Sequence, residues 1–161
     1  MSETTDFNPH EDGSALRISP PALAGLLLAG LLLLHLLGGG RHRFVHPHEL
    51  LGLLTVAAGV GLSSYAAALF AARATTKNPH GEPTAFITEG PYTFTRNPMY
   101  LGLAAALLGF ALFFGSPAML LAPVLFYLAI DRMLIPHEEA TMERLFGERY
   151  LDYKRRVQRW L

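Results

Sequence analysis

The residues best suited to chemistry lie in one short run near the middle of the chain. Between Gly90 and Gly102 the sequence reads GPYTFTRNPMYLG, which brings an arginine, an asparagine, two tyrosines and two prolines together. Gly-Pro and Asn-Pro both disfavour a continuous helix, because proline lacks an N–H and restricts the residue before it. We therefore expect an ordered loop over 88–97 and a helix that begins near Pro98.

A second charged group follows further along the chain. Asp131 and Arg132 end an apolar block, and Glu138 and Glu139 come shortly after. Ionisable side chains at membrane depth are costly, which makes Arg132 a candidate functional residue. Its alternative reading is an arginine whose charged head reaches out of the membrane from a helix end. The two glutamates also suit the first turn of any helix, where negative charge is favourable.

Apolar residues are 51% of the chain and gather in four long blocks. A bilayer core needs about 20 residues of helix. We therefore predict an all-α integral membrane protein, with a mobile polar tail over 1–17 and a single domain over 18–161. The four predicted spans are about 18–37, 50–72, 98–114 and 118–135.

The last two spans are joined by the tight turn 115–117, so they form an antiparallel hairpin. The loop before this hairpin and the segment after it therefore return to the same membrane face. In residues 136–160, apolar side chains recur every three or four positions among many arginines, which predicts a basic amphipathic helix on the membrane surface. Gly147 is expected to break this helix. Tyr150, Tyr153 and Trp160 are expected to anchor it at the interface.

The distribution of basic residues predicts the orientation. Lysine and arginine are concentrated in the C-terminal segment and, as Arg73, Lys77 and Arg96, around the middle loop, so both regions are expected in the cytoplasm. Four spans then place the N-terminus there too, as in a bacterial inner-membrane protein. Arg41 and Arg43 argue mildly against this topology. The second span carries several small residues, which we expect to allow close helix packing.

Several classes of function are disfavoured by composition. The chain has no cysteine, which excludes a disulfide, a thiol nucleophile or a cysteine metal site. Its formal net charge is zero, which gives no case for a nucleic-acid partner. Histidines 42, 46 and 48 have no acidic or cysteine partner at a known ligand spacing beyond Glu49, so we expect solvated loop histidines and no metal site. The sequence leaves the oligomeric state open.

The two charged segments together resemble a known family. The pattern Gly90-x-Tyr92-x-x-x-Arg96-Asn97-Pro98-x-Tyr100-x-Gly102, followed by Arg132, Glu138-Glu139 and Phe146-Gly147-x-x-Tyr150-x-x-Tyr153, is similar to that of the isoprenylcysteine carboxyl methyltransferases. That family includes the phospholipid N-methyltransferases, and the resemblance covers about residues 88–160. It implies an integral membrane enzyme that transfers a methyl group from S-adenosylmethionine.

The resemblance also implies which residues form the site. Arg132 and Glu139 are the expected catalytic residues, with Arg132 near the methyl acceptor. The expected cofactor-binding residues are Gly90, Tyr92, Arg96, Asn97, Pro98, Tyr100, Glu138 and Glu139. Which residue contacts which part of the cofactor is left open, because arginine suits a carboxylate, glutamate suits an ammonium or ribose hydroxyl, and tyrosine can stack or hydrogen-bond. Asn97 stands where the family often has histidine, so no role here can depend on an imidazole.

The acceptor is expected to be lipophilic, with a carboxylate, an amine or a thiol as the methylated group. An ammonium acceptor must first lose a proton, and Glu138 or Glu139 could serve as that base. Two alternatives remain. Sterol reductases share a broadly similar C-terminal arrangement, but no glycine-rich dinucleotide fingerprint follows a strand here. The second alternative, a non-catalytic membrane scaffold, would not explain the polar residues of the Arg96 loop.

Overall fold

The computed structural model describes residues 18–38, 48–73 and 86–161, and this part of the chain is helical without any strand. The elements in order are α1 (Pro20–Leu37), α2 (His48–Arg73), the 3₁₀ turn η1 (Gly90–Thr93), α3 (Pro98–Phe113), the 3₁₀ turn η2 (Pro117–Leu120), α4 (Leu121–Ala129), the π-helical turn η3 (Ile130–Leu134), α5 (Ile135–Phe146) and α6 (Glu148–Arg156). The predictions for the tail 1–17, Arg41, His42, Arg43, His46 and Lys77 lie outside the described residues.

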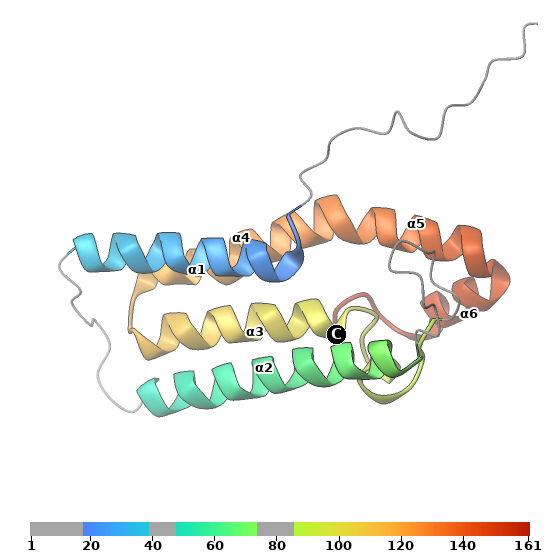
Figure 1. The fold of residues 1–161 in the computed structure, drawn as a ribbon, viewed down its shortest axis with the longest axis horizontal. Coiled ribbons are helices and arrows are strands. Elements are labelled where there is room, and N and C mark those ends of the chain that lie inside the picture. Colours follow the sequence, from blue (N-terminus) through green and yellow to red (C-terminus); the bar gives the residue numbers. More distant parts are fainter. Residues whose placement is uncertain (1–17, 39–47, 74–85) are drawn as a thin grey trace, which may run out of the picture.

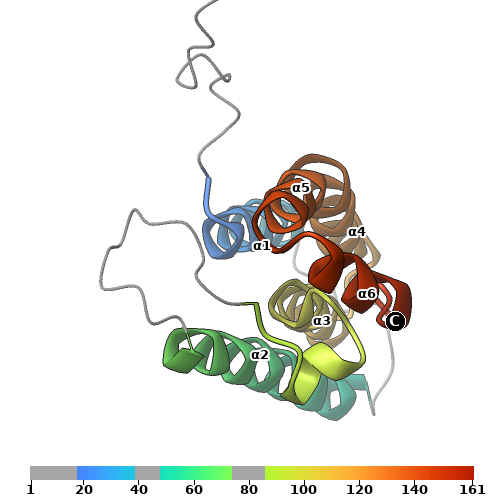
Figure 2. The ribbon, with the colours of Figure 1, turned by 90° about the vertical axis from the view of Figure 1, so that its right-hand side faces the viewer.

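The helices α1 to α4 lie side by side along the long axis of the molecule (Figure 1). Seen end-on, α3 lies between α2 on one side and α1 with α4 on the other, and α3 contacts all three (Figure 2). α5 and α6 extend beyond this bundle at the end where α3 begins. The loop before α3 and the C-terminal segment therefore share one end of the molecule.

Three described helical runs are long and apolar enough to cross a membrane: α1, α2 and the run Pro117–Phe146. Many large apolar side chains on their surfaces are exposed, as contact with lipid requires. The predicted all-helical character is confirmed for the described residues, and these three runs have the length and apolarity that membrane spans require. α3 is apolar but has only 16 residues, so the count of four spans stays a prediction. The first three predicted spans match α1, α2 and α3 to within two residues at either end.

The helix predicted from residue 136 corresponds to α5, which begins at Ile135, but it continues directly from the preceding helical turn. Helical structure runs without interruption from Pro117 to Phe146. Pro136 lacks an N–H and its ring would crowd the carbonyl four residues earlier. The π-helical turn η3 lies immediately before it, and such turns widen a helix locally. We attribute the continuity of the helix across Pro136 to this turn.

The predicted surface helix over 136–160 is broken where expected but ends earlier than expected. The expected break at Gly147 is confirmed, since this residue adopts φ +52 between α5 and α6. The helix does not reach residue 160, because α6 ends at Arg156 and Val157 is extended. Backbone groups beyond this point bond to the loop before α3 instead of continuing the helix.

The contact between α2 and α3 depends on paired glycines. A Cβ added to Gly59 would lie 2.5 Å from the carbonyl oxygen of Gly102, and one on Gly52 would lie 2.8 Å from that of Gly109. The two backbones therefore touch directly, as small residues permit in membrane helices. The predicted packing role of the glycines in the second span is confirmed for Gly52 and Gly59.

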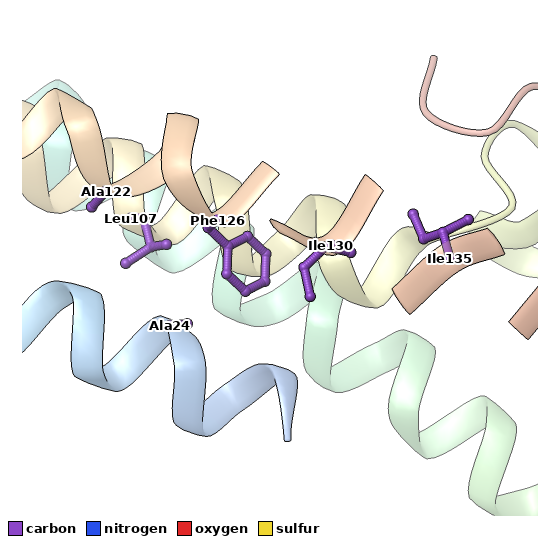
Figure 3. Packing of buried hydrophobic residues seen from close by; sticks show 6 residues of the cluster. All are labelled: Ala24, Leu107, Ala122, Phe126, Ile130 and Ile135. Carbon is purple, nitrogen blue, oxygen red and sulfur yellow. The ribbon is translucent and has the colours of Figure 1, made fainter. Parts of the chain in front are cut away.

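An apolar core joins α3 to the long C-terminal helical run. Figure 3 shows its buried residues: Ala24, Leu107, Ala122, Phe126, Ile130 and Ile135. Phe126 and Ile135 are fully buried. Because α1, α3 and the 117–146 run all contribute, this core fixes the position of α5 relative to the start of α3, where the charged residues meet.

The glycine contact gives a stability prediction. Gly59→Ala should lower the melting temperature in detergent, because overpacking a tight contact costs about 1–3 kcal/mol. Gly61→Ala is the matched control on the same helix, since a Cβ there meets nothing within 4 Å. Thermal unfolding followed by circular dichroism would compare them. Equal melting temperatures would contradict the direct backbone contact.

Candidate functional site

The loop before α3 is bonded to the C-terminal segment. The Arg96 N–H donates to the carbonyl of Gln158 at 2.9 Å. The Arg159 carbonyl accepts from the Thr95 hydroxyl at 3.1 Å and from the Asn97 side-chain amide at 3.0 Å. The prediction that these two distant segments meet is therefore confirmed.

A buried carboxylate lies at the centre of this contact. The side chain of Glu139 is 7% exposed and that of Arg96 is 9% exposed, and the two bond at 2.8 Å. Arg159 donates to both carboxylate oxygens of Glu139, at 3.2 and 2.8 Å. Lys154 lies 3.3 Å from the same carboxylate and 2.6 Å from Glu143. Charge-assisted bonds of this kind are stronger than neutral ones.

Arg96 is committed mainly to the protein itself. One terminal nitrogen donates to Glu139, and the other donates to the backbone carbonyls of Lys154 and Val157 at 3.0 and 2.7 Å. Only its Nε is buried without a partner among the described residues. Arg96 therefore holds segments of the protein together. The sequence left open that Arg96 binds a cofactor carboxylate through two nitrogens, and such binding would require these bonds to break.

A cavity of about 490 Å³ lies between the loop, the start of α3, α5 and α6. Its walls are largely apolar. Seven of the residues predicted to bind a cofactor line it: Tyr92, Arg96, Asn97, Pro98, Tyr100, Glu138 and Glu139. Gly90 does not line it; its positive φ of 59 lets the chain turn close to Tyr65 and Leu69 of α2.

The polar part of the cavity is formed by Glu138 and two tyrosines. The Tyr100 hydroxyl donates to the Glu138 carboxylate at 2.5 Å. Burial, and then the negative charge of Glu138, raise the pKa of Tyr92 to about 12. Tyr92 is therefore a neutral hydroxyl at physiological pH. Glu138 forms no ion pair with any described residue, so its carboxylate is the negative group that remains available to a cationic ligand.

The basic groups around Glu139 keep their charge. Hydrogen bonding to Glu143 is the main cause that raises the pKa of Lys154. Hydrogen bonding to Glu139 is likewise the main cause that raises the pKa of Arg159. The cluster is therefore held by ion pairs between fully charged groups.

The structure does not bring Arg132 to the cavity. Its side chain is 77% exposed and lies 3.7 Å from Asp131 on the surface of the π-helical turn. Asp131 instead faces Arg159 and Trp160. The catalytic role expected for Arg132 stays a prediction, and any such role would act on a group outside this cavity.

Several lining residues were not predicted from the sequence. Tyr150 and Tyr153 are each 4% exposed, so their interpretation as interface anchors is wrong. They pack in an aromatic cluster with Phe86 and Phe146. Their three-residue spacing, on the apolar stripe with Phe146, was the signal for a shared buried face. The lining residues missed include Phe70, Phe86, Ile87, Met142, Tyr150 and Tyr153.

The described part of the chain is thus all-helical, with helices long and apolar enough to span a membrane and a largely apolar, carboxylate-bearing cavity at one end of them. A family model described as phospholipid methyltransferase matches residues 48–149, well over half of the chain. The chain thus belongs to the phospholipid methyltransferase family, and the resemblance seen in its motifs is confirmed. Over 63 residues it is also 40% identical to an uncharacterized protein of Haemophilus influenzae, covering 39% of this chain and all of that protein.

The buried carboxylate gives a second prediction. Glu139→Gln should lower stability markedly, because removing one partner of a buried ion pair costs about 3–5 kcal/mol. Glu148→Gln makes the same chemical change at a side chain that is 81% exposed, and it should leave the melting temperature nearly unchanged. Thermal unfolding of both purified variants measures the difference. A Glu139→Gln protein as stable as the wild type would show that the cluster does not hold the loop.

Proposed function

We propose that the protein transfers a methyl group from S-adenosylmethionine to a lipid-like acceptor at the membrane surface. The observation that carries this proposal is a single cavity lined by both halves of the family motif, the loop residues 92–100 and the glutamates 138–139. Membership of a methyltransferase family that acts on phospholipids supports the reaction class.

The cavity suits this cofactor. Its volume falls within the range of about 300–1,000 Å³ that is usual for small-molecule sites. The aromatic side chains of Phe86 and Tyr150 offer surfaces for the adenine ring. The Glu138 carboxylate suits the ammonium or the ribose hydroxyls, and the buried Arg96 Nε is a donor that lacks a partner. A site with an available carboxylate also favours a ligand whose net charge is positive.

When bound, the cofactor supplies a methyl group on a positively charged sulfur, which leaves as a neutral thioether once the methyl is transferred. The protein's task is to align donor and acceptor and to exclude water, and it requires no covalent intermediate. The aromatic cluster around Phe86 excludes water, and the Tyr100 hydroxyl orients the Glu138 carboxylate. For an ammonium acceptor, Glu138 is the better candidate base, because Glu139 is held by three cations.

The proposal includes the location of the protein, and two alternative functions are less well supported. The basic C-terminal region and the N-terminus lie on the cytoplasmic side of a bacterial inner membrane. The acceptor enters the cavity from the lipid. A nicotinamide-dependent reductase is less well supported, because the sequence lacks a dinucleotide fingerprint. A scaffold would not need a cavity lined by aromatic side chains and a carboxylate.

Binding and product identification test the proposal. Purified protein should bind S-adenosylmethionine and S-adenosylhomocysteine in calorimetry, and NADPH should not bind. Membranes that contain the protein, incubated with methyl-labelled cofactor, should yield a labelled lipid, whose structure identifies the acceptor. Glu138→Gln should weaken cofactor binding by about ten- to a hundredfold, since a hydrogen bond to a charged group contributes about 1.5–3 kcal/mol. Glu148→Gln is the exposed control. Absence of binding to either sulfur compound would refute the proposal.

The exposed Arg132 gives a separate kinetic prediction. If Arg132 contacts the acceptor from outside the cavity, Arg132→Ala should raise the KM for the acceptor several-fold and leave the dissociation constant of the cofactor unchanged. Arg156→Ala, another exposed arginine near the same end, is the control. Steady-state kinetics with the identified lipid measures both constants. An unchanged KM would remove Arg132 from the site.

A further inference from the structure

The last five residues return across the molecule after α6 ends. The chain leaves the helix at Val157, which is extended, and the C-terminus lies beside the start of α3 (Figure 1). The backbone carbonyls of Val157, Gln158 and Arg159 all accept hydrogen bonds from the loop before α3. We call residues 157–161 the C-terminal strap.

Arg159 connects this strap to two further parts of the structure. Its guanidinium donates to both oxygens of Glu139 on α5 and to Asp131 on the π-helical turn, at 3.2, 2.8 and 3.2 Å. Its backbone carbonyl accepts from Thr95 and Asn97 of the loop. One residue therefore joins the loop, the π-helical turn and α5.

Trp160 provides a second attachment at the same place. Its indole N–H donates to Asp131 at 2.9 Å, and its ring lies 4.8 Å from that of Tyr127. It also packs against the apolar core that contains Phe126. The strap is therefore held by both polar and apolar contacts, and Asp131 accepts hydrogen bonds from both Arg159 and Trp160.

The strap residues Arg159 and Trp160 do not line the cavity, whereas several residues bonded to the strap do. Arg96 and Asn97 bond to its backbone, and Glu139 bonds to the Arg159 side chain. An effect of Arg159 on a ligand can therefore pass through residues that line the cavity. A lysine could not fully replace Arg159. An ammonium is a compact point charge, whereas the planar guanidinium can donate to two carboxylates at once.

We propose that Arg159 is a positioning residue of the cofactor cavity: by bonding Glu139, Asp131 and the Arg96–Asn97 loop together, it sets the arrangement in which the cavity binds its ligand. This inference rests on the proposed function, because the ligand is taken to be S-adenosylmethionine. It adds to that function a residue outside the cavity and outside the family motif.

The sequence contains a single tryptophan, Trp160, so its fluorescence reports on the strap without any ligand. Arg159→Gln and Arg159→Lys should make Trp160 more accessible to acrylamide quenching. The same variants should bind S-adenosylhomocysteine about tenfold more weakly in calorimetry, by analogy with the loss found when the partners that orient a ligating side chain are removed. Arg155→Gln is the matched control, because its exposed side chain pairs only with Asp152 and Glu148 among the described residues.

A double variant separates positioning from simple charge compensation. In Asp131→Asn with Arg159→Gln, no unpaired charge is left at Asp131. If Arg159 only neutralised Asp131, this protein would recover both stability and affinity. Positioning instead predicts that the melting temperature recovers only in part, because Glu139 still lacks Arg159, while cofactor binding stays weak. The double variant and Arg159→Lys keep the test valid should Arg159→Gln fail to fold.

The results distinguish the two proposals. Weaker binding together with greater quenching supports the positioning role. Wild-type affinity in folded Arg159 variants overturns it, whether or not Trp160 becomes more accessible. A wild-type protein that binds no S-adenosylhomocysteine overturns the proposed function instead, and the quenching data still show whether Arg159 holds the strap.

Discussion

The arrangement of the site depends on one buried carboxylate, that of Glu139. A buried charge is stable only when it is paired and hydrogen-bonded, and Glu139 meets this need with Arg96, Lys154 and Arg159. These three partners come from the loop before α3, from α6 and from the C-terminal strap. Because desolvation makes a missing partner costly, all three segments must converge on α5 for the charge to be satisfied.

The bundle provides the rigid frame for this convergence. Paired glycines let α2 and α3 touch along their backbones, and the core around Phe126 joins α3 to the 117–146 helical run. The loop therefore starts from a fixed helix end. The π-helical turn keeps that run continuous past Pro136, so α5 projects beyond the bundle and carries Glu138 and Glu139 to the cavity.

The two adjacent glutamates have different surroundings and therefore different roles. Glu139 is paired with cations and organises the structure, while Glu138 bonds to a neutral tyrosine and keeps its charge available. Adjacent residues on a helix point in directions about 100° apart, which explains how one faces the charged cluster and the other faces the cavity beside Tyr100. The arginines differ in the same way: Arg96 and Arg159 are ion-paired with Glu139, whereas Arg132 is exposed.

The sequence by itself determined the helical membrane class, the start of α3 at Pro98, the break at Gly147 and the family, because these follow from local chemistry: apolar length, proline and glycine geometry, and motif spacing. It also identified most of the polar residues around the cavity. Only the tertiary structure decided that Arg96 is already bonded, which ring packs against Tyr150 and Tyr153, and that Arg159 and Trp160 both bond to Asp131. Those outcomes depend on which segments meet across long stretches of chain, and hydrogen-bond partners of that kind leave no periodic trace in the sequence.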